Sequence, residues 1–312
     1  MSLLHRQAML DVIDSLAHNT LQGKIRALRI AIVCLLAGGH LLIEDIPGLG
    51  KTSLALALSR VLGLSFGRVQ CTSDLLPSDI TGLSIFDRQT NNFRFIQGPI
   101  FNHLILLDEV NRAMPKTQSA MLEAMEEMRV TVEGVTYPLP NPFMVIATQN
   151  PVEQIGTFAL PESQLDRFLA TTDIGYPPAE LEQQIIQHGS IRHQLEGLRP
   201  RLEPQQILEA RAAVSHIKLA DNLAGYIHAL ALASREHSMV QSGISTRGGI
   251  NLAGAARAEA YLEGRDFVIP EDVQAIAVQV EAHRLILKPE YESQSKQEII
   301  RSLLQKLAVP LV

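Results

Sequence analysis

Apolar residues form short continuous runs in the first half of the chain and follow a helical period in the second half. Three continuous runs occupy residues 40–44, 103–107 and 143–147. Such runs, separated by stretches of helical spacing, are typical of strands buried on both faces of a parallel sheet. Residues 1–39 carry apolar side chains at helical spacing and are predicted to form two helices around Gly23. Residues 1–178 are therefore predicted to form an α/β domain.

The pattern changes after the segment Tyr176-Pro177-Pro178. Residues 179–312 are rich in Ala, Leu, Gln, Glu and Arg at helical period and contain no convincing strand run. Because proline interrupts regular structure, we expect a hinge at this segment. The sequence thus predicts two domains, an α/β domain at residues 1–178 and a smaller all-α domain at residues 179–312.

Length and composition agree with a two-domain soluble protein. The chain has 312 residues, of which 46% are hydrophobic and 19% are charged. Its longest apolar stretch, residues 30–37, is far shorter than the roughly 20 residues that a membrane span requires. Residues 1–6 lack the layout of a signal peptide. We therefore expect a cytoplasmic protein without membrane insertion.

The charge balance disfavours nucleic acid as a partner. The formal net charge is −6, and no block of Lys or Arg is longer than two residues. Non-specific DNA binding depends on phosphate neutralisation by basic residues. Aromatic residues make up only 4%, so platforms for base stacking are also not expected. The two cysteines, Cys34 and Cys71, have no metal-binding spacing, and Cys34 is expected to be a small buried hydrophobe.

Residues 45–52 read Asp-Ile-Pro-Gly-Leu-Gly-Lys-Thr, between a predicted strand and a predicted helix at residues 53–62. Glycines permit the unusual backbone angles that turn N–H groups toward a phosphate chain. Lys51 places a positive charge on the β- and γ-phosphate oxygens, and Thr52 presents a hydroxyl to Mg²⁺. The residues expected to bind the nucleotide here are Gly48, Leu49, Gly50, Lys51, Thr52 and Ser53. Asp45 departs from the pattern G-x-x-x-x-G-K-[ST], which has glycine at this position, so a chance Gly-rich turn is the alternative.

The second predicted strand ends in two acidic residues, Asp108 and Glu109. A carboxylate at the C-terminal end of a strand lies at the ligand crevice of a parallel sheet. Asp108 is therefore expected to hold Mg²⁺, and Glu109 to activate the attacking water. The alternative is a surface pair that caps the following helix. Together with the loop at residues 45–52, the pair predicts hydrolysis of a nucleoside triphosphate.

Polar residues also follow the third predicted strand. Asn150 is expected to reach the γ-phosphate or the attacking water, with Gln149 as the second choice. The alternative is that Asn150 and Pro151 only begin a turn.

Two arginines are candidates for completing the site. Arg167 follows the helix-like stretch at residues 161–165, and it is a candidate arginine finger for a neighbouring subunit. Its alternative is an ion pair with Asp166 or Glu162. Arg247 begins a predicted helix after a Gly/Ser stretch and is placed to reach back over the hinge to the nucleotide. Its alternative is an exposed arginine at a helix start.

These motifs together resemble those of the MoxR-type AAA+ ATPases. The segments that carry the resemblance are residues 38–52, 107–113, 147–151 and 160–168. The likeness runs from about Leu21 to Arg284. It implies that Lys51 and Thr52 belong to Walker A, Asp108 and Glu109 to Walker B, Asn150 to sensor 1, Arg167 to the arginine finger and Arg247 to sensor 2.

The resemblance also implies two inserted hairpins and a ring. The hairpins are expected at about residues 80–95 and 129–139, facing either the pore or the partner, with plain sheet packing as the alternative. Between them, Met121, Met125 and Met128 lie at helical spacing and are expected to pack in the core. The ring is expected to be a hexamer that uses Mg²⁺ and ATP to remodel or activate client proteins, including proteins with von Willebrand A domains.

Three other functions remain open from the sequence. One is a DNA-directed AAA+ motor, which the negative net charge disfavours. A second is an activity like that of magnesium chelatase, which differs only in its partner. The third is a scaffold that binds ATP without turnover, which Glu109 and Asn150 disfavour.

Overall fold

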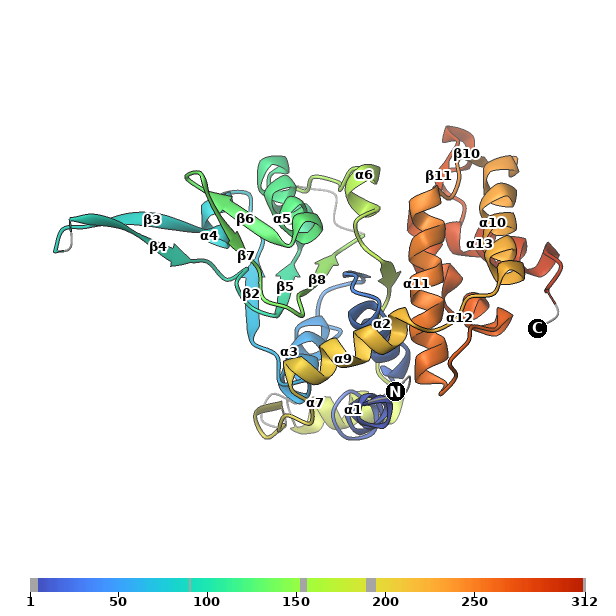
Figure 1. Ribbon diagram of the computed structural model, residues 1–312, viewed down its shortest axis with the longest axis horizontal. Helices are drawn as coiled ribbons and strands as arrows, with labels where there is room; N and C mark the ends of the chain where they lie inside the picture. The colour runs from blue at the N-terminus through green and yellow to red at the C-terminus, as the bar shows by residue number, and fades with distance from the viewer. Residues whose placement is uncertain (1–4, 90, 152–155, 189–194, 311–312) are drawn as a thin grey trace.

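A five-stranded parallel sheet forms the centre of the first domain (Figure 1). The computed structural model describes residues 5–89, 91–151, 156–188 and 195–310. The strand order is β2-β5-β8-β1-β9, with all neighbours parallel. The strands are β1 (Leu41–Glu44), β2 (Phe66–Gln70), β5 (Leu104–Asp108), β8 (Met144–Gln149) and β9 (Ala170–Thr172). The α/β fold and its three predicted strands, now β1, β5 and β8, are confirmed.

The two edge strands, β2 and β9, were not predicted from the sequence. Buried and exposed residues alternate in β2, because only one side of an edge strand faces the core. Strand β9 has only three residues, fewer than a hydrophobic run needs to stand out. Edge strands therefore lack the continuous apolar pattern of the central strands.

Helices cover both faces of the sheet. The helices of this part of the chain are α1 (Arg6–Asn19), α2 (Ile25–Leu36), α3 (Lys51–Val61), α4 (Pro77–Thr81), α5 (Pro115–Glu127) and α6 (Glu162–Leu165). Consecutive residues of a strand point to opposite faces of the sheet, so Leu106 packs in one core cluster and Leu107 in the other. Met121 and Met125 are buried in the second cluster and Met128 packs against it, which confirms their predicted core role.

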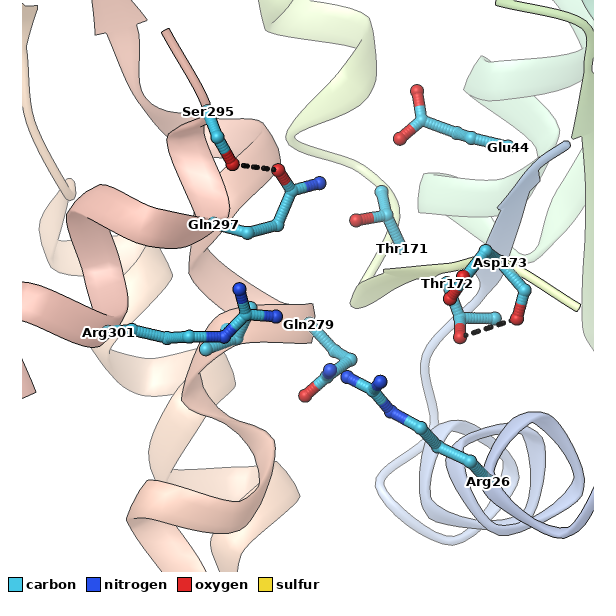
Figure 2. Close-up of a pocket in the computed structure, with 10 residues that line it drawn as sticks. Arg26, Glu44, Thr171, Thr172, Asp173, Gln279, Ser295, Gln297 and Arg301 are labelled. Carbon is cyan, nitrogen blue, oxygen red and sulfur yellow. Dashed lines mark hydrogen bonds between the residues drawn. The ribbon is translucent and has the colours of Figure 1, made fainter. Parts of the chain in front are cut away.

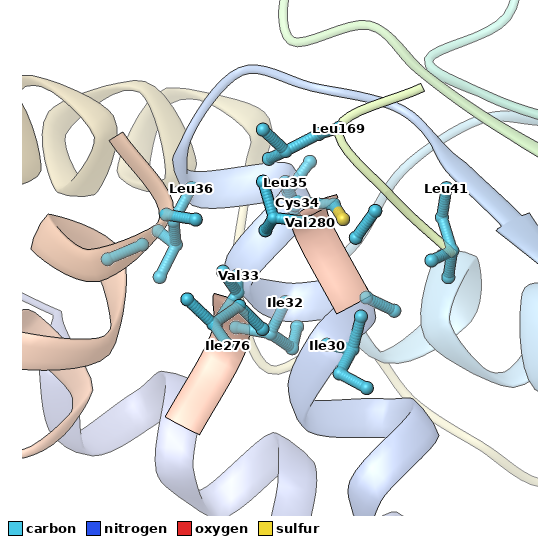
Figure 3. Packing of buried hydrophobic residues seen from close by; sticks show 14 of the residues in the cluster. Ile30, Ile32, Val33, Cys34, Leu35, Leu36, Leu41, Leu169, Ile276 and Val280 are labelled. Carbon is cyan, nitrogen blue, oxygen red and sulfur yellow. The ribbon is translucent and has the colours of Figure 1, made fainter. Parts of the chain in front are cut away.

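One hydrophobic core joins the sheet to the C-terminal helices. Figure 3 shows side chains of α2 packed close to Leu169 and to Ile276 and Val280 of α12 (Pro270–Glu281). Cys34 of α2 is fully buried in this cluster, as predicted, and burial raises the pKa of its thiol. The two parts of the chain therefore share an apolar contact.

The C-terminal part is helical with one small sheet. Its remaining helices are α7 (Ala179–His188), α9 (Pro204–Ser215), α10 (Asp221–Glu236), α11 (Thr246–Leu262) and α13 (Lys296–Lys306). Strands β10 (Val240–Ser242) and β11 (Ile286–Leu287) pair antiparallel, so the expectation of no strand after residue 178 was wrong. These strands have two or three residues each, too few to give a sequence pattern. Short 3-10 helices occupy Val110–Arg112, Ala282–Arg284 and Pro289–Tyr291.

The boundary at residue 178 stays a prediction. Helix α9 lies beyond it and yet packs on α2, where Arg211 Nε donates to the Leu35 carbonyl over 2.6 Å. None of the described helices is long and apolar enough to cross a membrane.

Both inserted hairpins are present. Strands β3 (Gly82–Asp87) and β4 (Asn92–Gln97) form the first, which extends away from the body of the molecule (Figure 1). Strands β6 (Arg129–Val132) and β7 (Val135–Pro138) form the second. The rings of Phe95 and Tyr137 stack with centroids 4.2 Å apart, so the base of the first hairpin packs on the second. Large apolar side chains farther along the first hairpin remain exposed, including Phe86 and Phe93.

Arg284 binds the C-terminal helices to the turn after α6. Its Nε lies 2.8 Å from Asp166 Oδ1, and its other nitrogens donate to the carbonyls of Phe168 and Leu169. Nearby Glu281 is fully buried, and neither of its carboxylate oxygens has a hydrogen-bond partner among the described residues. Burial raises the pKa of Glu281 to about 7, although the positive charge of Arg284 opposes this shift.

Replacing Glu281 by Gln is expected to remove a pH dependence of stability. The folded chain holds a proton on Glu281 up to about pH 7, whereas the unfolded chain releases it near its ordinary pKa of 4.5. The folded state binds more protons within this window, so the free energy of unfolding falls as the pH rises through it. At about pH 8, Glu281→Gln should be the more stable by the order of 1–3 kcal/mol. Urea unfolding of both chains across this pH range measures the difference, and parallel pH profiles would contradict the expectation.

Candidate active site

The loop between β1 and α3 has the backbone conformation of a phosphate cradle. Gly48 and Gly50 have φ angles of +89° and +95°, which disfavour any residue with a side chain. Lys51 begins α3, and its Nζ donates to the carbonyl of Asp45. Burial lowers the pKa of Lys51, while the carboxylates of Asp45, Asp108 and Glu109 oppose that shift. The loop thus presents turned backbone groups and one positive charge at the end of β1.

The structure brings Thr52 and Asp108 together. Asp108 ends β5 and is only 6% exposed, and its Oδ2 lies 3.4 Å from Thr52 Oγ1. A hydroxyl and a carboxylate oxygen at this separation are the hard ligands that Mg²⁺ prefers. The residues present therefore fit a Mg²⁺ ion between α3 and β5.

Two side chains of β2 hold the acidic pair. Arg68 Nε lies 2.9 Å from Asp108 Oδ2, and Gln70 Nε2 donates to Glu109 Oε2 over 3.2 Å. Arg112 also lies 3.2 Å from Glu109 Oε2. Arg68 and Gln70 were not predicted from the sequence, although their alternation within residues 66–70 indicates that both point to one side of β2.

Thr148 in β8 fixes the acidic pair from the other neighbouring strand. Its Oγ1 accepts from the backbone N–H of Glu109 over 2.9 Å and donates to Asp108 Oδ1 over 3.3 Å. Glu109 itself has a φ of 55°, in the left-handed region. Because the backbone leaves the strand direction at this residue, the carboxylates of Asp108 and Glu109 take different directions. Thr148 was also missed, since a threonine within an apolar run carries no chemical signal of its own.

Gln149 and Asn150 take different positions at the end of β8. Gln149 Nε2 donates to Glu44 Oε1 over 2.5 Å, so its amide is bound to β1 rather than to the acidic pair. Asn150 directly follows β8, which neighbours β5 in the sheet. Asn150 thus stays the better placed of the two predicted residues.

An apolar cavity of about 500 Å³ opens beside the loop. Its walls come from the loop, from the turn between α1 and α2, from the segment after β9 and from α7. Leu21, Leu49, Ile174, Tyr176 and Ile185 are among its apolar lining residues. Of the described residues after 178, only those of α7 line this cavity.

A second, polar cleft of about 310 Å³ separates the edge of the sheet from α12 and α13. Figure 2 shows Arg26, Gln279 and Arg301 around one space, with Glu44 and Asp173 on its other side. Burial raises the pKa of Glu44, and the hydrogen bond from Gln149 opposes this shift. The contact between sheet and C-terminal helices is therefore open and polar here, unlike the apolar contact of α2 with α12.

Arg167 and Arg247 meet at one carboxylate. Glu126 at the end of α5 lies 3.1 Å from Arg167 Nε and 2.7 Å from an Arg247 guanidinium nitrogen. The hydrogen bond from Arg247 lowers the pKa of Glu126. Arg167 therefore pairs with Glu126 rather than with Asp166 or Glu162. Both arginines line a small cavity to which none of residues 45–53 contributes, so the structure does not bring Arg247 to the phosphate loop.

Removing the cation next to Asp108 is expected to destabilise the nucleotide-free chain. Arg68→Met leaves the buried carboxylate without its charged donor, so the free energy of unfolding should fall by about 1–2 kcal/mol. Arg94→Met is the matched control, because Arg94 is exposed on β4. Urea unfolding of both variants measures the effect, and equal losses would show that Arg68 has no special role.

Family models match both parts of the chain. Residues 40–170 match the ATPase family associated with various cellular activities (AAA), and residues 232–303 match the AAA lid domain. The chain is 43% identical to the uncharacterised protein YeaC of Bacillus subtilis, covering 93% of this chain and 91% of that one. It is 38% identical to the chaperone MoxR1 of Mycobacterium tuberculosis, covering 90% and 77%.

A solved structure extends the likeness to the whole fold. A protein from Cytophaga hutchinsonii that is assigned as an ATPase superposes with a TM-score of 0.90 at 37% identity, covering 99% of this chain and 97% of that one. The relatives above span most of the chain at well over 30% identity. The chain therefore belongs to the MoxR group of AAA ATPases.

Proposed function

We propose that this chain hydrolyses ATP with Mg²⁺ at the site formed by the phosphate loop and the acidic pair. The observation that carries the proposal is the meeting of Thr52 and Asp108, 3.4 Å apart, beside a cavity large enough for a base. Lys51 lies near this pair, because the negative charges of Asp108 and Glu109 act on its ammonium group. A triphosphate supplies the oxygens that Lys51 and the metal need as partners.

Each residue then has a separate task. The N–H groups at Gly48 to Ser53 bind phosphate oxygens, and Thr52 and Asp108 hold Mg²⁺, which neutralises charge on those oxygens. Glu109 orients the attacking water and accepts its proton. Asn150 contacts the γ-phosphate or that water from the end of β8. Arg68 and Gln70 keep the two carboxylates in place from β2.

The apolar cavity takes the adenine base. Its volume and lining fit a flat heterocycle, and it opens directly onto Gly48 and Gly50. Helix α7 covers the base from the side of the C-terminal part. This placement makes α7 the element whose position depends most directly on whether a nucleotide is bound.

The two arginines on Glu126 are assigned to the site of a neighbouring subunit. Arg167 and Arg247 are 27% and 52% exposed in the single chain, and they lie apart from its own phosphate loop. A guanidinium supplied by a neighbour stabilises the charge that develops on the transferred phosphoryl group. Subunits therefore assemble into a ring, which we infer to be a hexamer.

The ring remodels protein clients in the cytoplasm. The exposed apolar side chains on β3 and β4 offer a surface for a client, and one relative is named a chaperone. The coupling of this hairpin to β7 through Phe95 and Tyr137 connects it to the segment that leads into β8. Proteins with von Willebrand A domains are the client class that we propose.

Glu109→Gln is expected to trap ATP without turnover. The amide cannot accept a proton from water, so kcat should fall by about 10²–10⁴-fold while ATP affinity changes little. Glu123→Gln serves as the control, because it makes the same change at an exposed position on α5. Steady-state ATPase assays and calorimetric titration with ATP measure both quantities, and equal turnover in all three chains would point to a scaffold rather than an enzyme.

A mixing experiment tests the ring. Lys51→Ala subunits cannot bind phosphate normally but keep Arg167, whereas Arg167→Ala subunits keep an intact phosphate loop. Mixed subunits should regain ATPase, since the first kind supplies the arginine and the second the site. Each inactive variant alone gives the baseline. An absence of rescue at every mixing ratio would remove the ring from the proposal.

A further inference from the structure

Asp45 occupies the position at which the phosphate-loop pattern has glycine, and its carboxylate has three partners. Its Oδ1 accepts from the N–H of Ile46 over 2.8 Å. Its Oδ2 accepts from the N–H groups of Ile174 and Gly175 over 2.9 and 2.7 Å. Asp45 lies outside the set of residues with positive φ, so the backbone does not require glycine here. The side chain thus connects the phosphate loop to a segment about 130 residues away.

Lys24 binds the same segment from the opposite side. It is only 6% exposed, and its Nζ donates to the carbonyls of Ile174 and Gly175. Burial lowers the pKa of Lys24, while the negative charges of Asp45 and Asp173 oppose this shift. Asp45 therefore holds the N–H groups of residues 174 and 175 while Lys24 holds their carbonyls. The partly buried carboxylate of Asp45 and the buried ammonium group of Lys24 thus clamp one short stretch of backbone between them.

The clamped stretch begins one wall of the apolar cavity. Ile174, Tyr176 and Pro177 line it, and α7 follows within a few residues. On the other side Gly23 packs so closely on Pro178 that a Cβ on Gly23 would lie 2.7 Å from the ring of that proline. The turn between α1 and α2, the segment after β9 and the phosphate loop are thereby fixed relative to one another.

We propose that Asp45 is a positioning residue that fixes the wall of the apolar cavity relative to the phosphate loop, with Lys24 as its counterpart. The inference rests on the proposed nucleotide site. Asp45 acts through the segment at residues 174–178 and needs no contact with phosphate. Lys51 Nζ donates its hydrogen bond to the backbone carbonyl of Asp45, so this bond does not depend on the carboxylate. Removing the carboxylate leaves the phosphate cradle in place and frees the wall that holds the base.

The test compares a ligand that has a base with one that lacks it. Asp45→Gly restores the glycine of the pattern and removes the clamp, so the Kd for Mg²⁺–ATP should rise about tenfold or more, as expected when two hydrogen bonds to a carboxylate are lost. The Kd for Mg²⁺ and inorganic tripolyphosphate, which reaches only the loop, should stay within about threefold. In turnover, KM for ATP should rise about tenfold while kcat stays within about threefold.

Two further variants sharpen the comparison. Lys24→Met should reproduce the pattern of Asp45→Gly, and the double variant should lose little more than either alone, because both changes open the same clamp. Asp11→Asn is the matched control: it removes an exposed carboxylate on α1 that pairs with Gln7 outside the clamp, and both affinities should remain unchanged. Circular dichroism with thermal unfolding confirms that each variant is folded.

The outcomes separate this inference from the function on which it rests. Equal losses for ATP and tripolyphosphate, or a fall in kcat without a change in KM, would mean that Asp45 supports the loop in general and overturn the inference alone. An unchanged ATP affinity in Asp45→Gly would do the same. Absence of ATP binding to the unchanged chain would overturn the proposed function and this inference together.

Discussion

The site depends on one buried negative charge, the carboxylate of Asp108. A carboxylate that is 6% exposed is costly unless donors surround it. Arg68, Thr52 and Thr148 supply these donors from β2, α3 and β8, the three elements that flank β5. The strand order places β2 and β8 on either side of β5, so the topology of the sheet itself brings Arg68 and Thr148 to Asp108. Arg68 is half-exposed whereas Thr148 is fully buried, so Arg68 is the donor of this pair with the greater freedom to move.

The contacts between the two parts of the chain differ in kind. The apolar contact of α2 with α12 excludes water, whereas the cleft around Gln279 is open and polar. Arg284 binds the turn that includes Arg167 to the end of α12 through Asp166 and two carbonyls. Arg167 is therefore held by the C-terminal helices as well as by the sheet domain. A change in the position of these helices would therefore move Arg167 as well.

Sequence patterns predicted the elements that carry their own periodicity. The central strands are buried on both faces and stand out as continuous apolar runs, and the phosphate loop and acidic pair combine a local pattern with local chemistry. Strand β2 does not stand out, because as an edge strand it alternates and its polar residues read as solvent-facing. The roles of Arg68 and Thr148 depend on a neighbour about 40 residues away, and Arg167 and Arg247 share Glu126, from which Arg247 is 121 residues distant in the sequence. Such pairings are properties of the tertiary fold and leave no trace in spacing.

Asp45 shows how a departure from a motif can carry information. Glycine at this loop position is usually explained by backbone freedom, but the φ angle here is ordinary, so a side chain is tolerated. The carboxylate then becomes available for a tertiary contact that glycine cannot make, and the positive charge of nearby Lys24 acts on it. This partly buried carboxylate has three N–H donors and a nearby ammonium group, so its hydrogen-bonding capacity and its charge are both matched. The loop therefore gains a fixed connection to the wall of the apolar cavity at the position where its sequence is least typical.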